Sequence, residues 1–195
     1  ELIDSTRVQE LPINNRNFAK LAELAPGVSS DLPDEVGVGL TSTMSLSVNG
    51  ARRNAINWLV DGVMNVDVGS NITLLSTPTL ESIEQFKIIT SSYAAEWPRS
   101  GGGIINVVTK SGASKFSGSG YEFFRNDGLN SNSYFRKQST DPAIRDAPPY
   151  LRYNNFGFTV GGPATKSKDK LFFFFSEEFR RIKIGRAHVL TPVTL

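Results

Sequence analysis

Three things are scarce in this sequence, and each scarcity excludes a kind of chemistry. None of the 195 residues is cysteine, so neither disulfides nor thiolate metal sites are available. His188 is the only histidine, and any nucleophile–histidine pair would depend on this one residue near the chain end. No apolar run approaches the roughly 20 residues that a membrane-spanning helix requires. We therefore predict no enzyme, no cofactor and no metal site.

Charge gives no sign of a nucleic-acid partner. The 21 basic and 19 acidic residues leave a formal net charge of only +2, so no nucleic acid is expected. The triplet Gly101–Gly103 lacks the lysine and hydroxyl of a phosphate-binding loop, which argues against nucleotides. Glu177 and Glu178 are adjacent on a predicted strand and point to opposite faces, so they cannot form a facing acid–base pair.

One stretch in the middle of the chain predicts a compact unit. Residues 83–89 alternate between a mostly apolar and a mostly polar face, as in a half-buried strand. Ser92 is placed to cap a short helix that Pro98 must end. Behind it, Gly101–Gly103 lets the chain reverse before Ile104–Thr109, a β-branched run typical of a strand buried on both faces. We expect the two strands to lie in one central sheet.

Before this stretch, the pattern indicates one helix followed by short strands. Apolar residues at helical spacing predict a helix over residues 14–25, capped by Asn14 or Asn15, and the acidic segment 29–39 is predicted to be a loop. Two short strands follow, each ended by a tight-turn signal. The strands and their turns are 45–49 with Asn49-Gly50, and 55–60 with Asp61-Gly62.

After Gly112 the pattern changes to longer, aromatic strands. Three are predicted, at residues 115–125, 153–162 and 171–182. The first two are joined by a long polar loop over 130–149, and the last two by a short charged turn. In a soluble sheet, the run Phe172–Phe175 would place aromatic side chains on both faces and create an aggregation hazard. Long and short connections in alternation match an outer-membrane β-barrel, so we favour barrel strands over a sandwich edge.

Six blocks of sequence carry a resemblance to a known family. They read LPINNRNFAKLAELAPGV, SVNGARRNAINWLVDGV, IEQFKIITSSYAAEW followed by GGGIINVVTKSG, YEFFRND, FGFTVGGP and KLFFFFSEE. Any one block would be a weak signal, whereas six in this order are specific. Together they resemble the plug domain and first barrel strands of TonB-dependent outer-membrane receptors, with the closest likeness to the Oar-like branch.

The resemblance implies a fold and a function. The implied fold class is an α+β plug domain followed by the first antiparallel strands of a transmembrane β-barrel. The implied domains are residues 1–112 for the plug, 113–183 for the first strands and loops, and 184–195 for a non-native tail, because that tail resembles translated sequencing adapter. In this family, the plug gates energy-coupled passage of a large or scarce substrate through the barrel.

The resemblance also implies partners, a location and candidate site residues. The partners are the TonB energy-transducing complex, outer-membrane lipid and a transported substrate that could be a glycan, peptide, protein or chelate. The location is the Gram-negative outer membrane. Arg99 with Gly101, Gly102 and Gly103 is the expected plug hinge and plug–wall contact. We expect a fragment, truncated before Glu1, that lacks the TonB-contacting segment, an N-terminal domain and most of the barrel.

One alternative stays open at this point. A soluble, secreted β-rich module could bind carbohydrate or peptide by stacking on Trp58, Trp97 and Tyr93. Aromatic side chains in a domain of this size are more often core than ligand platform. A reading frame that continues into many more alternating strands would favour the transporter over the module.

Overall fold

The computed structural model describes residues 2–11, 13, 16–30, 46–69, 71–94, 97, 101–165 and 170–184. The chain divides into two compact units, Glu1–Gly118 with Thr159–Ser176 and Ser119–Phe158 with Glu177–Leu195. The first unit contains a mixed sheet with its covering helices. The second contains much of a sheet of long strands and a helical connection. None of the helices in the described part of the chain is long and apolar enough to cross a membrane.

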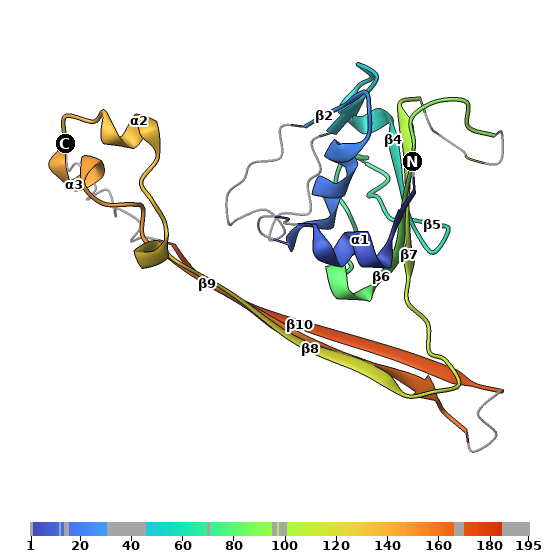
Figure 1. The fold of residues 1–195 in the computed structure, drawn as a ribbon. Coiled ribbons are helices and arrows are strands. Elements are labelled where there is room, and N and C mark those ends of the chain that lie inside the picture. Colours follow the sequence, from blue (N-terminus) through green and yellow to red (C-terminus); the bar gives the residue numbers. More distant parts are fainter. Residues whose placement is uncertain are drawn as a thin grey trace, which may run out of the picture. The chain divides into compact units, whose positions relative to one another are not determined.

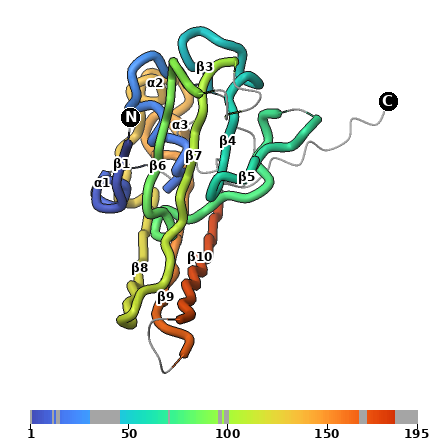
Figure 2. Tube along the Cα trace, turned by 90° about the vertical axis from the view of Figure 1, so that its right-hand side faces the viewer, coloured from blue at the N-terminus to red at the C-terminus, as the bar shows by residue number. Residues whose placement is uncertain are grey.

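A five-stranded sheet lies at the centre of the first unit (Figures 1 and 2). In spatial order its strands are β1 (Leu2–Asp4), β6 (Ile83–Ile89), β7 (Gly103–Thr109), β4 (Ile56–Val60) and β5 (Val63–Met64). Strands β4 and β7 are parallel, with Trp58 opposite Ile105, and the other neighbours are antiparallel. The prediction that residues 83–89 and 104–109 share one central sheet is confirmed.

The two central strands differ in how they are buried. In β7, Ile104 and Ile105 are both fully buried although they point to opposite faces, which confirms a strand covered on both sides. In β6, the register shifts between Ile83 and Gln85. The simple alternation predicted for residues 83–89 is therefore wrong at this point, because a bulge resets the side-chain period. The buried side chains of β6 are Ile83, Phe86 and Ile88.

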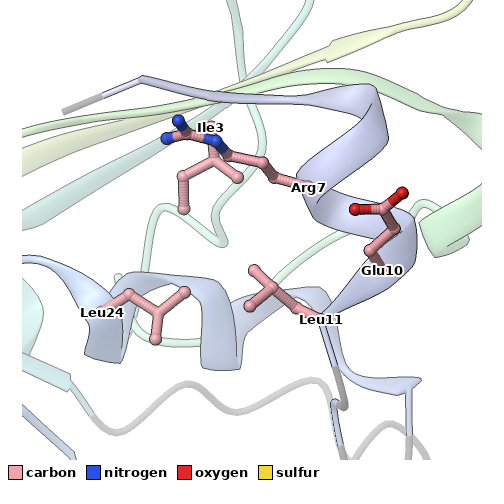
Figure 3. A pocket seen from close by; sticks show the side chains of 5 residues that line it. All are labelled: Ile3, Arg7, Glu10, Leu11 and Leu24. Carbon is pink, nitrogen blue, oxygen red and sulfur yellow. The ribbon is translucent and has the colours of Figure 1, made fainter.

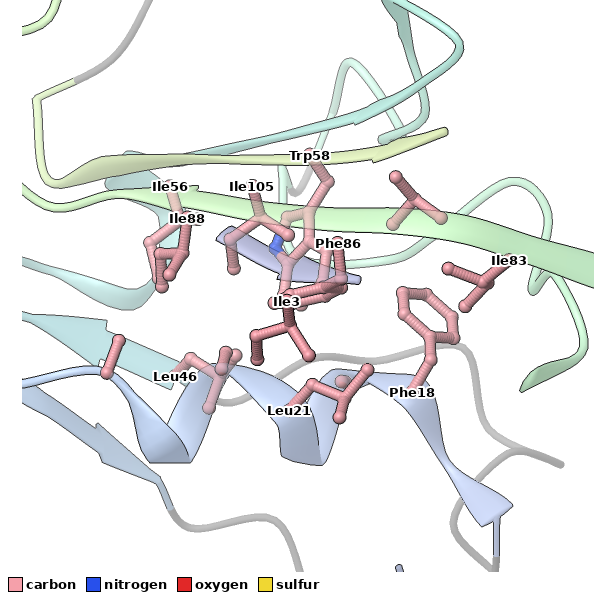
Figure 4. Close-up of a cluster of buried hydrophobic side chains, with 14 of the residues drawn as sticks. Ile3, Phe18, Leu21, Leu46, Ile56, Trp58, Ile83, Phe86, Ile88 and Ile105 are labelled. Atoms are coloured by element: carbon pink, nitrogen blue, oxygen red, sulfur yellow. The ribbon is translucent and has the colours of Figure 1, made fainter. Parts of the chain in front are cut away.

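A 3-10 helix, η2 (Phe18–Leu24), packs its apolar side on this sheet (Figure 4). Phe18 and Leu21 are buried, and the Phe18 ring meets the edge of Trp58 at 6.0 Å between centroids. The predicted apolar face is confirmed, but the helix is shorter and tighter than expected. Asn17 caps it, since its side chain accepts a hydrogen bond from the Ala19 amide. The predicted caps, Asn14 and Asn15, lie outside the described residues.

Smaller elements complete the first unit. They are α1 (Ser5–Glu10), β2 (Val28–Ser30), β3 (Leu46–Val48), η3 (Arg53–Ala55) and η4 (Leu80–Ser82). Strand β2 pairs with β3, and its last two residues fall in the segment 29–39 predicted to be a loop; residues 31–39 lie outside the described residues. The predicted turns are confirmed, because Asn49, Gly50, Asp61 and Gly62 all have positive φ between 50° and 79°.

The helix predicted after Ser92 is absent from the described residues there. Ser92 has a φ of 54°, whereas a helix N-cap is extended, and Tyr93 and Ala94 are not helical. Pro98 and residues 95 and 96 lie outside the described part of the chain. The prediction failed because a serine in front of residues that tolerate a helix does not by itself fix its own backbone angle.

Three long strands form a second sheet in the order β10-β9-β8 (Figure 1). They are β8 (Ser117–Asn126), β9 (Leu151–Pro163) and β10 (Phe172–Ile184). Gly118 lies beside Thr159 and Gly157 beside Tyr121, so β8 and β9 are antiparallel. The 13 residues of β9 exceed the roughly 9 to 11 that a tilted strand needs to cross a bilayer. All three strand predictions are confirmed within a few residues.

The connection between β8 and β9 is more ordered than the predicted loop. It contains η5 (Asp127–Leu129), α2 (Tyr134–Lys137) and α3 (Pro142–Arg145). All three begin at side-chain caps that the sequence does offer, and Asn126 caps η5. Ser133 caps α2, and Asp141 caps α3 with Pro142 following it in the first turn.

Candidate functional site

The glycine triplet leads into β7 and is held by one carbonyl group. The amides of Gly101 and Gly102 both donate to the carbonyl oxygen of Ala55, at 3.2 and 3.0 Å. Gly102 and Gly103 are buried, whereas Gly101 is exposed. The triplet is therefore anchored to the end of η3, directly before β4.

Close packing explains the need for glycine here. A Cβ atom on Gly102 would lie 2.8 Å from the Ala51 Cβ, and one on Gly103 would lie 3.2 Å from two carbons of Val48. One on Gly101 would meet only the Ala55 Cβ, at 3.7 Å, which is an ordinary contact. The predicted hinge role stays a prediction. Arg99, the other predicted site residue, lies outside the described residues.

Asp61 fixes the point where the chain leaves the sheet. Its carboxylate accepts two hydrogen bonds from Thr109, one from the amide and one from the hydroxyl, both at 2.8 Å. The next amide, Lys110, donates to the carbonyl oxygen of Ser82 at 2.8 Å. The sequence identified Asp61 only as a turn residue, because its partner is 48 residues away.

A buried carboxylate joins the amino-terminal segment to the sheet. Glu81, in η4, is 9% exposed; its Oε1 accepts from Arg16 at 3.0 Å and its Oε2 from Gln9 at 3.1 Å. Losing one partner of such a pair leaves an uncompensated buried charge. Sequence reasoning missed this network, since its members are 65 and 72 residues apart and a single glutamate before a strand carries no signal.

The two faces of the long sheet have different chemistry. Side chains alternate along each strand, and the stacked rings of Phe156 and Phe179, 5.3 Å apart, identify one face. We call it the aromatic face, and its large apolar members are Phe124, Phe156, Phe158, Val160, Phe173, Phe175 and Phe179. Several are exposed, including Phe124 at 53% and Phe175 at 48%. Large exposed apolar side chains gathered on one face of a strand in this way favour an interaction with protein or membrane.

The opposite face, which we call the polar face, holds a charged network beside Phe123 and Phe172, which are 41% and 40% exposed. The Tyr121 hydroxyl donates to Glu178 Oε2 at 3.2 Å, and Arg180 Nε donates to Oε1 at 2.8 Å. The Glu178 side chain is only 4% exposed. Between them lies Gly157, where a Cβ would be 2.6 Å from the tyrosine oxygen. The absence of a side chain at Gly157 is what lets Tyr121 reach across the middle strand.

Of the aromatic residues in the alternative hypothesis, Trp58 belongs to the core. Trp58 is only 2% exposed and packs edge-on against Phe18 in the core. Tyr93 and Trp97 are half-buried and lie next to segments outside the described residues.

One pocket of about 410 Å³ lies between the amino-terminal segment and η2 (Figure 3). Ile3, Leu11 and Leu24 give it apolar walls, and Arg7 and Glu10 add one charge of each sign. Such a pocket suits an apolar side chain and offers no nucleophile. Among the described residues, no group of three or more histidine, aspartate or glutamate side chains is arranged to hold a metal ion.

Comparison with known proteins assigns the carboxyl-terminal part of the chain to a class. The family model described as an outer membrane beta barrel domain matches residues 108–195. Its span includes the strands that carry the aromatic face. This part of the chain therefore resembles an outer-membrane β-barrel domain.

Individual relatives make the assignment narrower. The chain is 34% identical over 176 residues to the TonB-dependent transporter Oar from Myxococcus xanthus, a match that covers 88% of this chain and 15% of that protein. The outer membrane transporter YddB from Escherichia coli matches with a TM-score of 0.66 and 16% identity, over 94% of this chain and 26% of its own. The siderophore receptor PirA from Acinetobacter baumannii matches with a TM-score of 0.63 and 19% identity, over 92% of this chain and 24% of its own. These two structures show the fold alone.

The chain belongs to the TonB-dependent outer-membrane transporters, as the six sequence blocks predicted. It spans 15% of the length of the curated relative that it matches. The soluble secreted module finds no support in these comparisons.

Proposed function

We propose that residues 1–112 form the plug of such a transporter, that 113–183 form its first wall strands and loops, and that 184–195 are a non-native tail. The plug gates the passage of a large or scarce substrate through the complete barrel. The observation that carries this proposal is the exit at Thr109, where a mixed sheet held by Asp61 leads directly into long antiparallel strands with one aromatic face.

The chemistry of the two sheet faces supports this division. Charged side chains are expensive against hydrocarbon, so the aromatic face would contact lipid and the polar face the lumen. Ser176 lies on the polar face with Glu178, since the two are two positions apart on one strand. The Ser176 hydroxyl lies 3.1 Å from that of Thr79, which caps η4 of the mixed sheet. A plug element thus contacts the face expected to line the lumen.

Energy enters through the TonB complex in this proposal. The complex would act on a segment ahead of the plug and draw the plug away from the wall. The triplet Gly101–Gly103, with Arg99, would form the hinge and the plug–wall contact. The cargo could be a glycan, peptide, protein or chelate. The name of the Acinetobacter receptor indicates a siderophore for that protein.

A reversible cross-link between plug and wall tests the gate. Thr79→Cys and Ser176→Cys would be introduced together into the full-length transporter; the 195 residues of this chain add no further cysteine. Growth of a strain that requires the transporter is the measurement. We expect oxidation to stop growth and a reductant to restore it, while Ser176→Cys alone grows under both conditions. Normal growth with the cross-link formed would show that plug and wall need not separate there, and would reject the gate.

A further inference from the structure

The long connection between β8 and β9 is a folded surface element. Its two short helices are joined by Asn132, whose side-chain amide donates to the carbonyl oxygens of Ile144 and Arg145 at 2.8 and 2.9 Å. The side-chain oxygen of Asn132, Oδ1, accepts a hydrogen bond from Arg136 Nε at 3.0 Å. One side chain therefore fixes α2 against α3, so the surface of α2 is presented in a defined arrangement.

That surface is aromatic and open to solvent. Tyr134 is 71% exposed and Phe135 is 85% exposed, with their rings edge-on at 5.7 Å. Leu129 and Tyr150, which flank the helices, are also exposed, at 76% and 48%. A single turn of helix with its rings this exposed does not enclose a small molecule, since small-molecule sites are concave. It suits a broad surface that covers the rings.

Positive charge accompanies these rings. Arg136 and Lys137 follow directly, in the last turn of α2. Three carboxylates of the connection already have partners close by. Asp127 pairs with Arg152, Asp146 pairs with Arg145, and Asp141 accepts a hydrogen bond from the Ala143 amide. The hydrogen bond to Asp146 raises the pKa of Arg145, as expected for a self-contained pair. In the part of the chain that the structure describes, no carboxylate pairs with Arg136 or Lys137, so the patch favours an anionic partner.

The position of the connection in the barrel wall indicates which anionic partner the patch binds. Long connections of outer-membrane barrels face outward, whereas the short β9–β10 turn closes the other end of the strands. Charged side chains enter the aromatic face toward the long connection, at Glu122, Arg152, Glu177 and Arg181. On a barrel wall, the first such charges mark the level at which the hydrocarbon layer ends and water begins. Aromatic side chains are enriched at that interface. The rings and cations of α2 belong to the same compact unit as this end of the strands.

We propose that the surface of Tyr134, Phe135, Arg136 and Lys137 binds phosphate-bearing lipid headgroups of the outer leaflet. The rings enter the interface, and the two cations pair with lipid phosphates. This inference rests on the proposed function, because it requires residues 113–183 to be part of the barrel wall.

Lipid titration of the full-length transporter tests the proposal. The purified protein would be titrated with diphosphorylated lipid A and with its dephosphorylated form, and bound lipid would be counted by native mass spectrometry. We expect Arg136→Gln with Lys137→Gln to weaken binding of the phosphorylated lipid by roughly tenfold to thirtyfold. Binding of the dephosphorylated form should not change. Tyr134→Ser with Phe135→Ser should weaken the binding of both.

A matched control comes from the same chain. Arg52→Gln with Arg53→Gln removes the same charge from another exposed pair, which precedes β4, and should leave lipid binding unchanged. Equal binding by wild type and the Arg136/Lys137 variant would overturn the proposal. Loss of transporter-dependent growth in this variant with unchanged lipid binding would also overturn it, because the patch would then bind the cargo. Failure of the wild-type protein to assemble as a barrel would overturn the proposed function, and this inference with it.

Discussion

The hydroxyl of Tyr121 donates a hydrogen bond to the carboxylate of Glu178 from the opposite edge of a three-stranded sheet, passing over Gly157 on the middle strand. Neither residue could reach the other if the middle strand carried a side chain at that position. The contact links three strands at one level on the polar face.

We expect Gly157→Ala to lower the yield of assembled transporter strongly. The added Cβ would lie 2.3 Å from the backbone oxygen of Glu177 and 2.6 Å from the Tyr121 oxygen, and backbone cannot move aside cheaply. Gly120→Ala is the matched control, because nothing lies within 4 Å of its added Cβ. Heat-modifiable electrophoresis of outer-membrane fractions measures assembly. Equal assembly of the two variants would contradict the contact.

Replacing only Arg16 of the buried Arg16–Glu81 pair should destabilise the fold more than replacing both residues. Arg16→Met leaves a buried carboxylate and should destabilise the fold by about 3 to 5 kcal/mol, whereas Arg16→Met with Glu81→Leu should lose much less. Lys20→Met, which removes the more exposed Lys20–Glu23 pair, should cost no more than about 0.5 kcal/mol. Urea denaturation of the 195-residue chain in mild detergent is the measurement. A double variant no more stable than the single one would refute the coupling.

The glycine triplet offers a test that separates packing from hinge motion. Gly102→Ala should destabilise the fold by about 1 to 3 kcal/mol, because its Cβ would lie 2.8 Å from that of Ala51. Gly101→Ala meets only an ordinary contact and should leave stability unchanged. Growth supported by the full-length variants provides the second measurement. Reduced growth with Gly101→Ala at unchanged stability would favour the hinge, and normal growth would leave only the packing role.

The Asp61–Thr109 contact should slow amide exchange at the end of β7. Asp61→Ala removes both hydrogen bonds and should cost about 1 to 2 kcal/mol, with faster amide exchange at Thr109 and Lys110. Thr109→Val removes only the hydroxyl bond and should have roughly half that effect. Amide hydrogen exchange measured by mass spectrometry tests this prediction. If the Thr109 amide is protected equally in the Asp61→Ala variant, the strand end is held by the sheet alone.

Local patterns determined the strands and turns of this protein. The β-branched run at residues 104–109, the aromatic alternation after Gly112 and the Asn-Gly and Asp-Gly turns each carry their signal in adjacent residues, and the structure has them where expected. The transporter family could be predicted in the same way, because six blocks of sequence stand in the family's order.

Only the tertiary structure decided which distant residues meet. The bulge in β6, the Glu81 network and the Tyr121–Glu178 bond depend on register and on neighbours more than 50 positions away, or on an inserted residue that a two-residue period cannot anticipate. The same holds for the glycine triplet, because Ala51 and Val48, which leave little room for a side chain at Gly102 and Gly103, are distant in the sequence. A pattern of residues specifies which backbone form is favourable, whereas the space beside a glycine and the partner of a buried charge exist only after the chain has packed.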